Sequence, residues 1–332
     1  MAGHQPPWGP PPAPPPAPPQ VPPYGLPSPG PGYGPRYQYV PARRPPRRSA
    51  GGTIAGIIGA LAVVGVLTVL GLTAFGRVAG GAGAGPGAGG GPVRQAAAGT
   101  DRKLYASGSL TSVRCRLPAI AAGAESMRRF MNTLSDCLDG SWKSQFGRIG
   151  APFDPPRRVF WEQPGRSPCG NYPSPGASAF YCPANNTMYV GLRDVVATSG
   201  DEPLSHYAVF ARVIAHEYGH HVQDSAGILE RGNRLMQSED VTARNEASRR
   251  IELQAQCLAG AFLGAERDSL PMTRAQYEAL MADVRGRGDD RRPVAERDHG
   301  SGRHYAGWVA RGFRGRGLGV CNTWTVPASA VS

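Results

Sequence analysis

Three different patterns of hydrophobic and polar positions follow one another along the chain before a mixed pattern begins near residue 100. Residues 1–50 hold 19 of the 34 prolines and few apolar side chains, and residues 53–75 form an uninterrupted uncharged run. Residues 78–99 are rich in glycine. These shifts predict a tail (1–50), a membrane-crossing helix (53–75), a linker (78–99) and one folded domain (100–332).

The first of these parts, residues 1–50, has too few apolar residues to offset the entropy of ordering. We therefore expect a disordered tail with polyproline II character. It is either a ligand for a proline-recognising partner or a solvated tether without one, and composition alone favours the tether. The glycine-rich residues 78–99 are expected to form a flexible linker.

The apolar run 53–75 is long enough to cross a bilayer, because 23 helical residues at about 1.5 Å each span roughly 35 Å. It lies too far from the N-terminus and is too long for a secretory signal. Four arginines precede it, Arg43, Arg44, Arg47 and Arg48, and only Arg77 follows closely. The positive-inside rule predicts a single-pass protein of the cell membrane, with a cytoplasmic N-terminus and residues 78–332 outside.

The folded part, residues 100–332, shows helical and strand-like periodicities in separate regions. A helix is expected over 121–139. Short alternating runs predict strands of a small sheet at 158–161, 178–182 and 187–192. Apolar residues at helical spacing predict further helices near 203–226, 240–267, 273–285 and 302–314. Strands followed by helices, without βαβ alternation, indicate an α+β fold.

The charge of the chain is uneven and argues against nucleic-acid binding. The formal net charge is +12, but residues 1–50 contribute +5 and residues 101–332 only +5. A small excess spread over the whole folded part does not make a basic binding face. The arginines beside the apolar run are better explained as a membrane-orientation signal.

All six cysteines lie in the folded part, at positions 115, 137, 169, 182, 257 and 321. None of their spacings resembles a CxxC zinc knuckle. An even number confined to one region favours disulfides in an oxidising compartment, which agrees with the predicted topology. The alternative is six buried thiols in a cytosolic enzyme.

The strongest chemical signal is the H-E-x-x-H motif formed by His216, Glu217 and His220. On a helix, positions i and i+4 share one face, so the two imidazoles can bind one metal ion. Glu217 projects about 100° away and can reach a metal-bound water. Gly219, within the motif, is unfavourable in mid-helix unless another element packs closely there.

A third ligand is expected at Glu252, because this glutamate interrupts the apolar face of the helix predicted over 240–267. A carboxylate is normally excluded from such a face unless it is paired or binds a metal. Two histidines, one carboxylate and an open position make a typical catalytic zinc site.

The two helices carry a family resemblance. HEYGHHVQ, followed by RRIELQAQCLAG, resembles the bacterial putative neutral zinc metallopeptidase family, a gluzincin-type relative of thermolysin-like enzymes. Two further stretches are also similar to segments of this family: CGNYPSPGASAFYCPANNTMYVG (169–191) and HGSGRHYAGWVARGF (299–313). The resemblance therefore covers about residues 100–325. It implies a zincin-like domain with a small sheet and active-site helices. His216, His220 and Glu252 would then bind zinc, and Glu217 would be the catalytic base.

The chain departs from the family's pattern at Gln256, where the family usually has an aspartate. In thermolysin-like sites that aspartate accepts a hydrogen bond from a zinc-bound histidine. A glutamine oxygen can still accept the bond but carries no charge, so catalytic strength is affected more than metal binding.

The resemblance and the spacing together suggest a disulfide between Cys169 and Cys182. The next choice is Cys115–Cys137 with Cys257–Cys321, out of fifteen possible connectivities. A bridge from Cys257 would tether the C-terminal segment to the helix that carries Glu252.

We expect a membrane-anchored zinc endopeptidase that acts on peptides or proteins and binds no nucleic acid. The donor for the tetrahedral oxyanion stays open among His221, His299, His304, Tyr218 and Tyr305. The run 187–192 is either an exposed sheet edge, to which an extended substrate could add, or an ordinary core strand. The alternatives are a zinc-bound but inactive cell-surface scaffold, and a zinc hydrolase acting on a non-peptide bond or on cell-wall peptides.

Overall fold

The computed structural model describes residues 96–332 except 174–176 and 201. The expected tail (1–50), membrane helix (53–75) and nearly all of the linker (78–99) lie outside these residues. Among the helices that are described, none has the length and apolar character needed to cross a bilayer.

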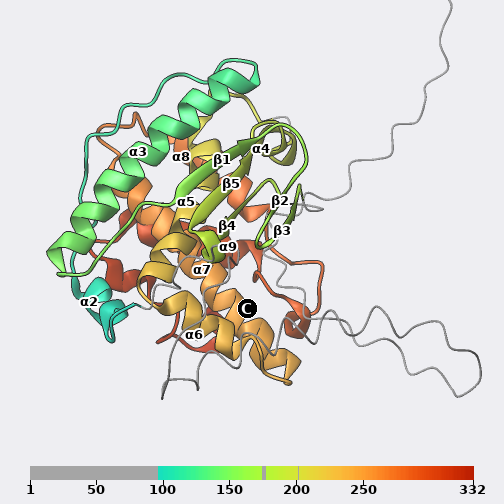
Figure 1. Ribbon diagram of the computed structural model, residues 1–332. Helices are drawn as coiled ribbons and strands as arrows, with labels where there is room; N and C mark the ends of the chain where they lie inside the picture. The colour runs from blue at the N-terminus through green and yellow to red at the C-terminus, as the bar shows by residue number, and fades with distance from the viewer. Residues whose placement is uncertain (1–95, 174–176, 201) are drawn as a thin grey trace, which may run out of the picture. The chain divides into compact units, whose positions relative to one another are not determined.

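Helices are the main regular structure of the described domain (Figure 1). They are α2 (Thr100–Ala106), α3 (Ala124–Arg148), α4 (Asp194–Thr198), α5 (Tyr207–Ser225), α6 (Ile228–Leu235), α7 (Val241–Ala265), α8 (Arg274–Arg285) and α9 (Gly302–Arg314). Short 3₁₀ turns include η3 (Leu318–Cys321). With its small sheet, the domain is a helix-dominated α+β fold, as the sequence predicts.

The long helices agree with the expected ranges, and the differences have local causes. Helix α3 continues past residue 139 because Trp142 and Phe146 extend its buried stripe. Helix α6 was not expected. It is separated from α5 by Gly227, whose φ of 73° ends one helix and begins the next.

The main sheet has three strands in the order β1-β5-β4. Strand β1 (Arg157–Trp161) pairs in parallel with β5 (Thr187–Gly191), and β4 (Ala179–Cys182) pairs antiparallel with β5. Strand β5 is therefore central, and the interpretation of residues 187–192 as an exposed edge is wrong. The parallel pairing with β1 joins distant segments and leaves no turn signal in the sequence. A small hairpin of β2 (Gly165–Ser167) and β3 (Gly170–Tyr172) was not expected.

Helix α5 lies at the centre of the hydrophobic core. Strands β4 and β5 and helix α3 pack against it, and α7 and α8 contact it as well. Helix α7 in turn packs along α9 (Figure 1). All residues of α5 from Ala208 to Gln223 are buried. The helix with the H-E-x-x-H motif is thus a core element held by both the sheet and the C-terminal helices.

Three disulfides hold the periphery to this core, and their pairs match those suggested above. Cys115–Cys137 ties the segment after α2 to α3, and Cys169–Cys182 ties the β2–β3 hairpin to β4. Cys257–Cys321 joins α7 to η3 in the C-terminal segment. The last bridge closes a loop of 64 residues and fixes the chain end against the helix of Glu252.

Glycines allow α7 and α9 to approach closely. A Cβ added at Gly312 of α9 would lie 1.9 Å from the carbonyl oxygen of Cys257 on α7. One added at Gly307 of the same helix would meet nothing within 4 Å. Gly312 therefore has a packing function, and Gly307 does not.

Gly312→Ala should destabilise the protein by about 1–3 kcal/mol, because overpacking forces the two helices apart. Gly307→Ala should be neutral or stabilising by up to about 1 kcal/mol, because alanine favours the helix. The midpoints of urea unfolding of the two variants test this pair. Equal midpoints for both would contradict the close helix contact.

Candidate metal centre

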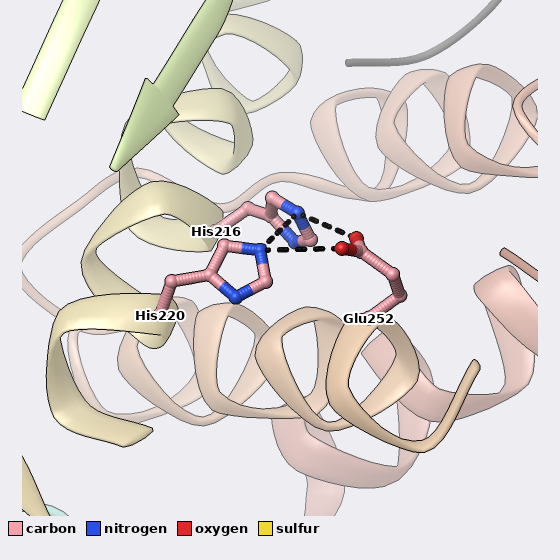
Figure 2. Close-up of side chains that lie close together, drawn as sticks. All are labelled: His216, His220 and Glu252. Carbon is pink, nitrogen blue, oxygen red and sulfur yellow. Dashed lines mark hydrogen bonds and ion pairs between the residues drawn. The ribbon is translucent and has the colours of Figure 1, made fainter. Parts of the chain in front are cut away.

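Three side chains from two helices converge in the interior (Figure 2). The Nε2 atoms of His216 and His220 on α5 lie 3.2 Å apart. The carboxylate of Glu252 on α7 lies 3.3 Å from Nε2 of His216 and 3.7 Å from Nε2 of His220. One potential ligand atom of each residue lies within 4.8 Å of the others. These are the three residues that the sequence suggested as ligands.

The chemistry of this donor set fits a metal ion. All three side chains are buried. Oε2 of Glu252 accepts no hydrogen bond within the part of the chain that the structure describes. A buried carboxylate facing two imidazole nitrogens costs free energy unless a cation compensates it. Two nitrogen ligands and one oxygen ligand suit zinc.

Gly219 explains how α7 comes close enough to supply Glu252. A Cβ at this position would lie 3.0 Å from Cα and from the carbonyl oxygen of Ala255. The glycine inside the motif thus marks the point where α5 and α7 touch, which is the close packing that the sequence called for. Glu252 lies nearly one turn before Ala255, beside the two histidines.

Both histidine ligands are held in the neutral form that can bind a metal. Burial lowers the pKa of His216 well below its usual value, and the nearby charges of Arg212 and His299 lower it further. Burial lowers the pKa of His220 to about 4, although the carboxylate of Glu252 acts in the opposite direction.

Glu217 is buried beside the ligands. Burial raises its pKa well above the usual value, and the charge of Glu252 raises it further. The guanidinium of Arg212 and the backbone of Tyr181 in β4 act in the opposite direction. A positive ion between the histidines would also favour the ionised form, because an opposite charge nearby lowers a carboxyl pKa.

The glutamine that contacts a histidine ligand is Gln223, not Gln256. Oε1 of Gln223 lies 2.9 Å from Nδ1 of His220. Among the described residues no hydrogen bond joins Gln256 to either histidine, and its amide lies beside the hydroxyl of Tyr305. The sequence signal for Gln223 is its place three residues after His220, on the same helix face.

The expected oxyanion donors separate into two groups. Tyr218 donates its hydroxyl to Asp139 at 2.8 Å, and Nδ1 of His304 lies 3.0 Å from the hydroxyl of Ser301. His221 packs among aromatic rings, with Nδ1 3.2 Å from the hydroxyl of Tyr181. These three side chains have structural contacts of their own. His299 and Tyr305 form the other group, because both are buried and each interacts electrostatically with a proposed ligand, His299 with His216 and Tyr305 with Glu252.

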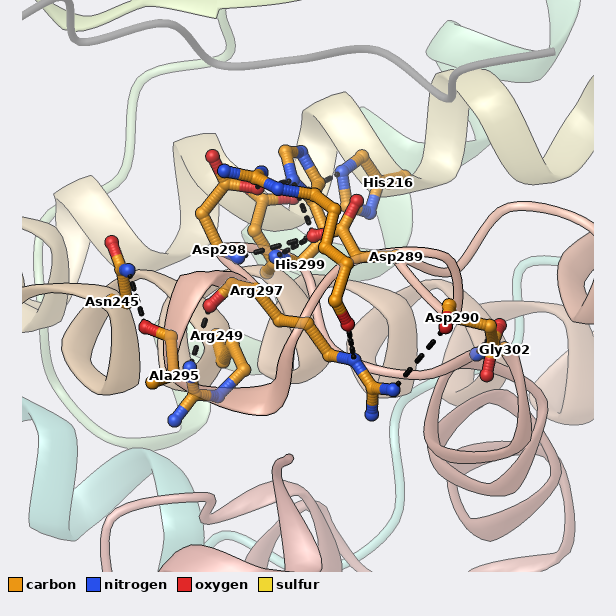
Figure 3. A network of polar contacts seen from close by, with 12 residues as sticks. His216, Asn245, Arg249, Asp289, Asp290, Ala295, Arg297, Asp298, His299 and Gly302 are labelled. Carbon is orange, nitrogen blue, oxygen red and sulfur yellow. Dashed lines mark hydrogen bonds and ion pairs between the residues drawn. The ribbon is translucent and has the colours of Figure 1, made fainter. Parts of the chain in front are cut away.

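His299 lies next to His216 in a polar network (Figure 3). Its Nδ1 is 2.8 Å from Oδ1 of Asp298, and its backbone N–H donates to Asp289. Burial opposes a charge on His299, but the bond to Asp298 and the charge of Glu252 raise its pKa to about 9. The raised pKa favours the protonated ring, in which both nitrogens are donors.

Comparison with known proteins agrees with this geometry. The model of the family described as "Putative neutral zinc metallopeptidase" matches residues 104–324. "Uncharacterized protein YpfJ" of Escherichia coli K12 is 29% identical over 222 residues, covering 62% of this chain and 74% of that protein. "Uncharacterized protein Rv2575" of Mycobacterium tuberculosis H37Rv is 28% identical over 212 residues, covering 57% and 67%. No solved structure matches the chain.

Proposed function

Because the chain belongs to the putative neutral zinc metallopeptidase family, we propose that it is a zinc-dependent endopeptidase. The observation that carries the proposal is the buried convergence of His216, His220 and Glu252 from two helices. Glu217, next to the first histidine, supplies the group that such a site needs for proton transfer.

Six side chains divide the work in the proposed reaction. His216, His220 and Glu252 would hold the zinc, which lowers the pKa of a bound water and polarises a carbonyl group. Glu217 takes a proton from the attacking water and passes it to the leaving amine. The ring of His299 and the hydroxyl of Tyr305 are the nearby donors for the oxygen that gains negative charge.

We also propose that the domain is anchored to the outer side of the cell membrane. The uncharged run 53–75 and the four arginines before it support this orientation. The three disulfides support it independently, since such bonds persist in oxidising compartments. The proline-rich tail 1–50 would then lie in the cytoplasm.

One feature favours a second function, a zinc-bound scaffold without activity. Gln256 stands where the family usually has an aspartate, and among the described residues its amide forms no hydrogen bond to either histidine ligand, so the support that such an aspartate gives a metal-bound histidine is missing from this position. The scaffold hypothesis predicts zinc binding without hydrolysis of any peptide, whether from a protein or from the cell wall.

Removal of the metal distinguishes the two functions. The full chain, purified in detergent, should cleave a fluorescently labelled unstructured protein. Dialysis against a chelator should reduce cleavage to background, and about one equivalent of zinc should restore it. Cleavage that persists without metal, or no cleavage from protein that holds one zinc per chain, would exclude the zinc endopeptidase.

A further inference from the structure

A chain of buried hydrogen bonds leads away from His220. It starts at the bond between Nδ1 of His220 and Oε1 of Gln223, which are 2.9 Å apart. It continues through Gln254 of α7 to the hydroxyl of Tyr105 on α2. His220, Gln223 and Gln254 are at most 1% exposed, so solvent does not replace these bonds.

The direction of the first amide is fixed by a backbone carbonyl. Nε2 of Gln223 donates to the carbonyl oxygen of Ile251 at 2.8 Å and to Oε1 of Gln254 at 3.0 Å. A carbonyl oxygen can only accept, so the NH₂ group of Gln223 must point there and its oxygen toward His220. The ring nitrogen Nδ1 must then carry the hydrogen.

The direction of the second amide is fixed in the same way. Nε2 of Gln254 donates to the carbonyl oxygen of Cys321 at 3.0 Å and to the hydroxyl of Tyr105 at 2.7 Å. The oxygen of Gln254 therefore faces Gln223. Cys321 is bonded to Cys257 of the same helix α7, which holds this carbonyl in place.

From these contacts we infer that Gln223, Gln254 and Tyr105 are positioning residues that hold His220 in the Nδ1–H tautomer, with Nε2 facing the metal site. The inference rests on the proposed zinc binding. A metal-bound histidine is commonly oriented through its other ring nitrogen, and losing such a partner weakens affinity about 10–100-fold. Here the orienting group is a neutral amide whose direction is fixed by two carbonyls.

The two histidine ligands differ in whether a hydrogen bond orients the ring through Nδ1. Nδ1 of His216 has no hydrogen-bond partner within the described residues. The orientation of His220 is thus the better determined of the two. The amide chain also explains how the site keeps an oriented ligand although Gln256 replaces the family's aspartate.

The matched test compares Gln223→Met with Gln145→Met. Both glutamines are buried, but Gln145 lies in α3, among contacts with residues 107, 111 and 148. Zinc affinity of the full chain in detergent is measured by competition with a chromophoric chelator. Gln223→Met should weaken it about 10–100-fold, and Gln145→Met should change it by less than about threefold, since that side chain does not contact a ligand.

A second readout observes the histidine of the wild type itself, and a variant serves only to assign its signal. With ¹⁵N-labelled histidine, the zinc-free wild type should show His220 as the Nδ1–H tautomer at neutral pH, its signal assigned by loss in His220→Gln. An Nε2–H tautomer there would overturn the inference, and so would wild-type zinc affinity in folded Gln223→Met. Wild-type protein that binds no zinc would instead refute the proposed function, whatever the tautomer.

Discussion

Replacing Glu217 with glutamine should lower kcat for peptide hydrolysis by about 10²–10⁴-fold and leave the zinc content unchanged. Glutamine has nearly the same shape but cannot accept a proton from water. The side chain of Glu217 is fully buried. It is not one of the proposed metal ligands, which are His216, His220 and Glu252, so its replacement should not remove the ion. Steady-state kinetics on a quenched fluorescent peptide, together with metal analysis of the same sample, measure both quantities.

Glu230→Gln is the control for this substitution. Glu230 lies exposed on α6, and within the part of the chain that the structure describes its only ion pair is with Arg234, one turn along. Its loss should leave kcat and zinc content as in the wild type, because exposed pairs contribute little. Unchanged hydrolysis by the Glu217 variant would show that another group takes the proton, and would remove this glutamate from the mechanism.

Replacing Glu252 with alanine should reduce the zinc content from about one ion per chain to nearly none. The loss of zinc affinity should exceed the 10–100-fold weakening expected when a residue that orients a ligand is replaced, because here a direct ligand is removed. The metal-free variant should be at least as stable as the metal-free wild type. Oε2 of Glu252 is buried without a hydrogen bond among the described residues, and such a group costs about 1–3 kcal/mol.

Glu246→Ala separates loss of the ligand from a general effect on α7. Glu246 lies in the same helix but pairs with Arg250, away from the histidines. This variant should keep its zinc. Metal analysis after gel filtration and thermal unfolding of the metal-free proteins provide the comparison. Equal zinc in the two variants would exclude Glu252 as a ligand.

The parts of the molecule that could be predicted are those specified by local spacing. The i, i+4 spacing of His216 and His220 needs only a helix, and the apolar positions around them predict one. Glu252 could be proposed because a carboxylate on an apolar helix face requires a partner. The disulfide pairs were suggested mainly by the family resemblance, since spacing alone leaves fifteen connectivities.

The parts that could not be predicted depend on contacts between distant segments. Strand β5 is central because β1 pairs with it in parallel, and nothing in residues 187–192 signals that neighbour. Gln223 looks like any other polar residue late in a helix until Ile251 and Gln254 are placed beside it. The expected contact of Gln256 with a histidine was inferred from a family pattern, and in space its amide faces Tyr305.

The most direct test of the zinc site is X-ray absorption at the zinc edge of the purified, zinc-loaded protein. Two imidazole nitrogens, one carboxylate oxygen and one water should give a shell of nitrogen and oxygen at about 2.0–2.1 Å, without sulfur. All six cysteines are bonded in disulfides, so a sulfur shell at about 2.3 Å would contradict the proposed centre. An unchanged spectrum after loss of either histidine would contradict it equally.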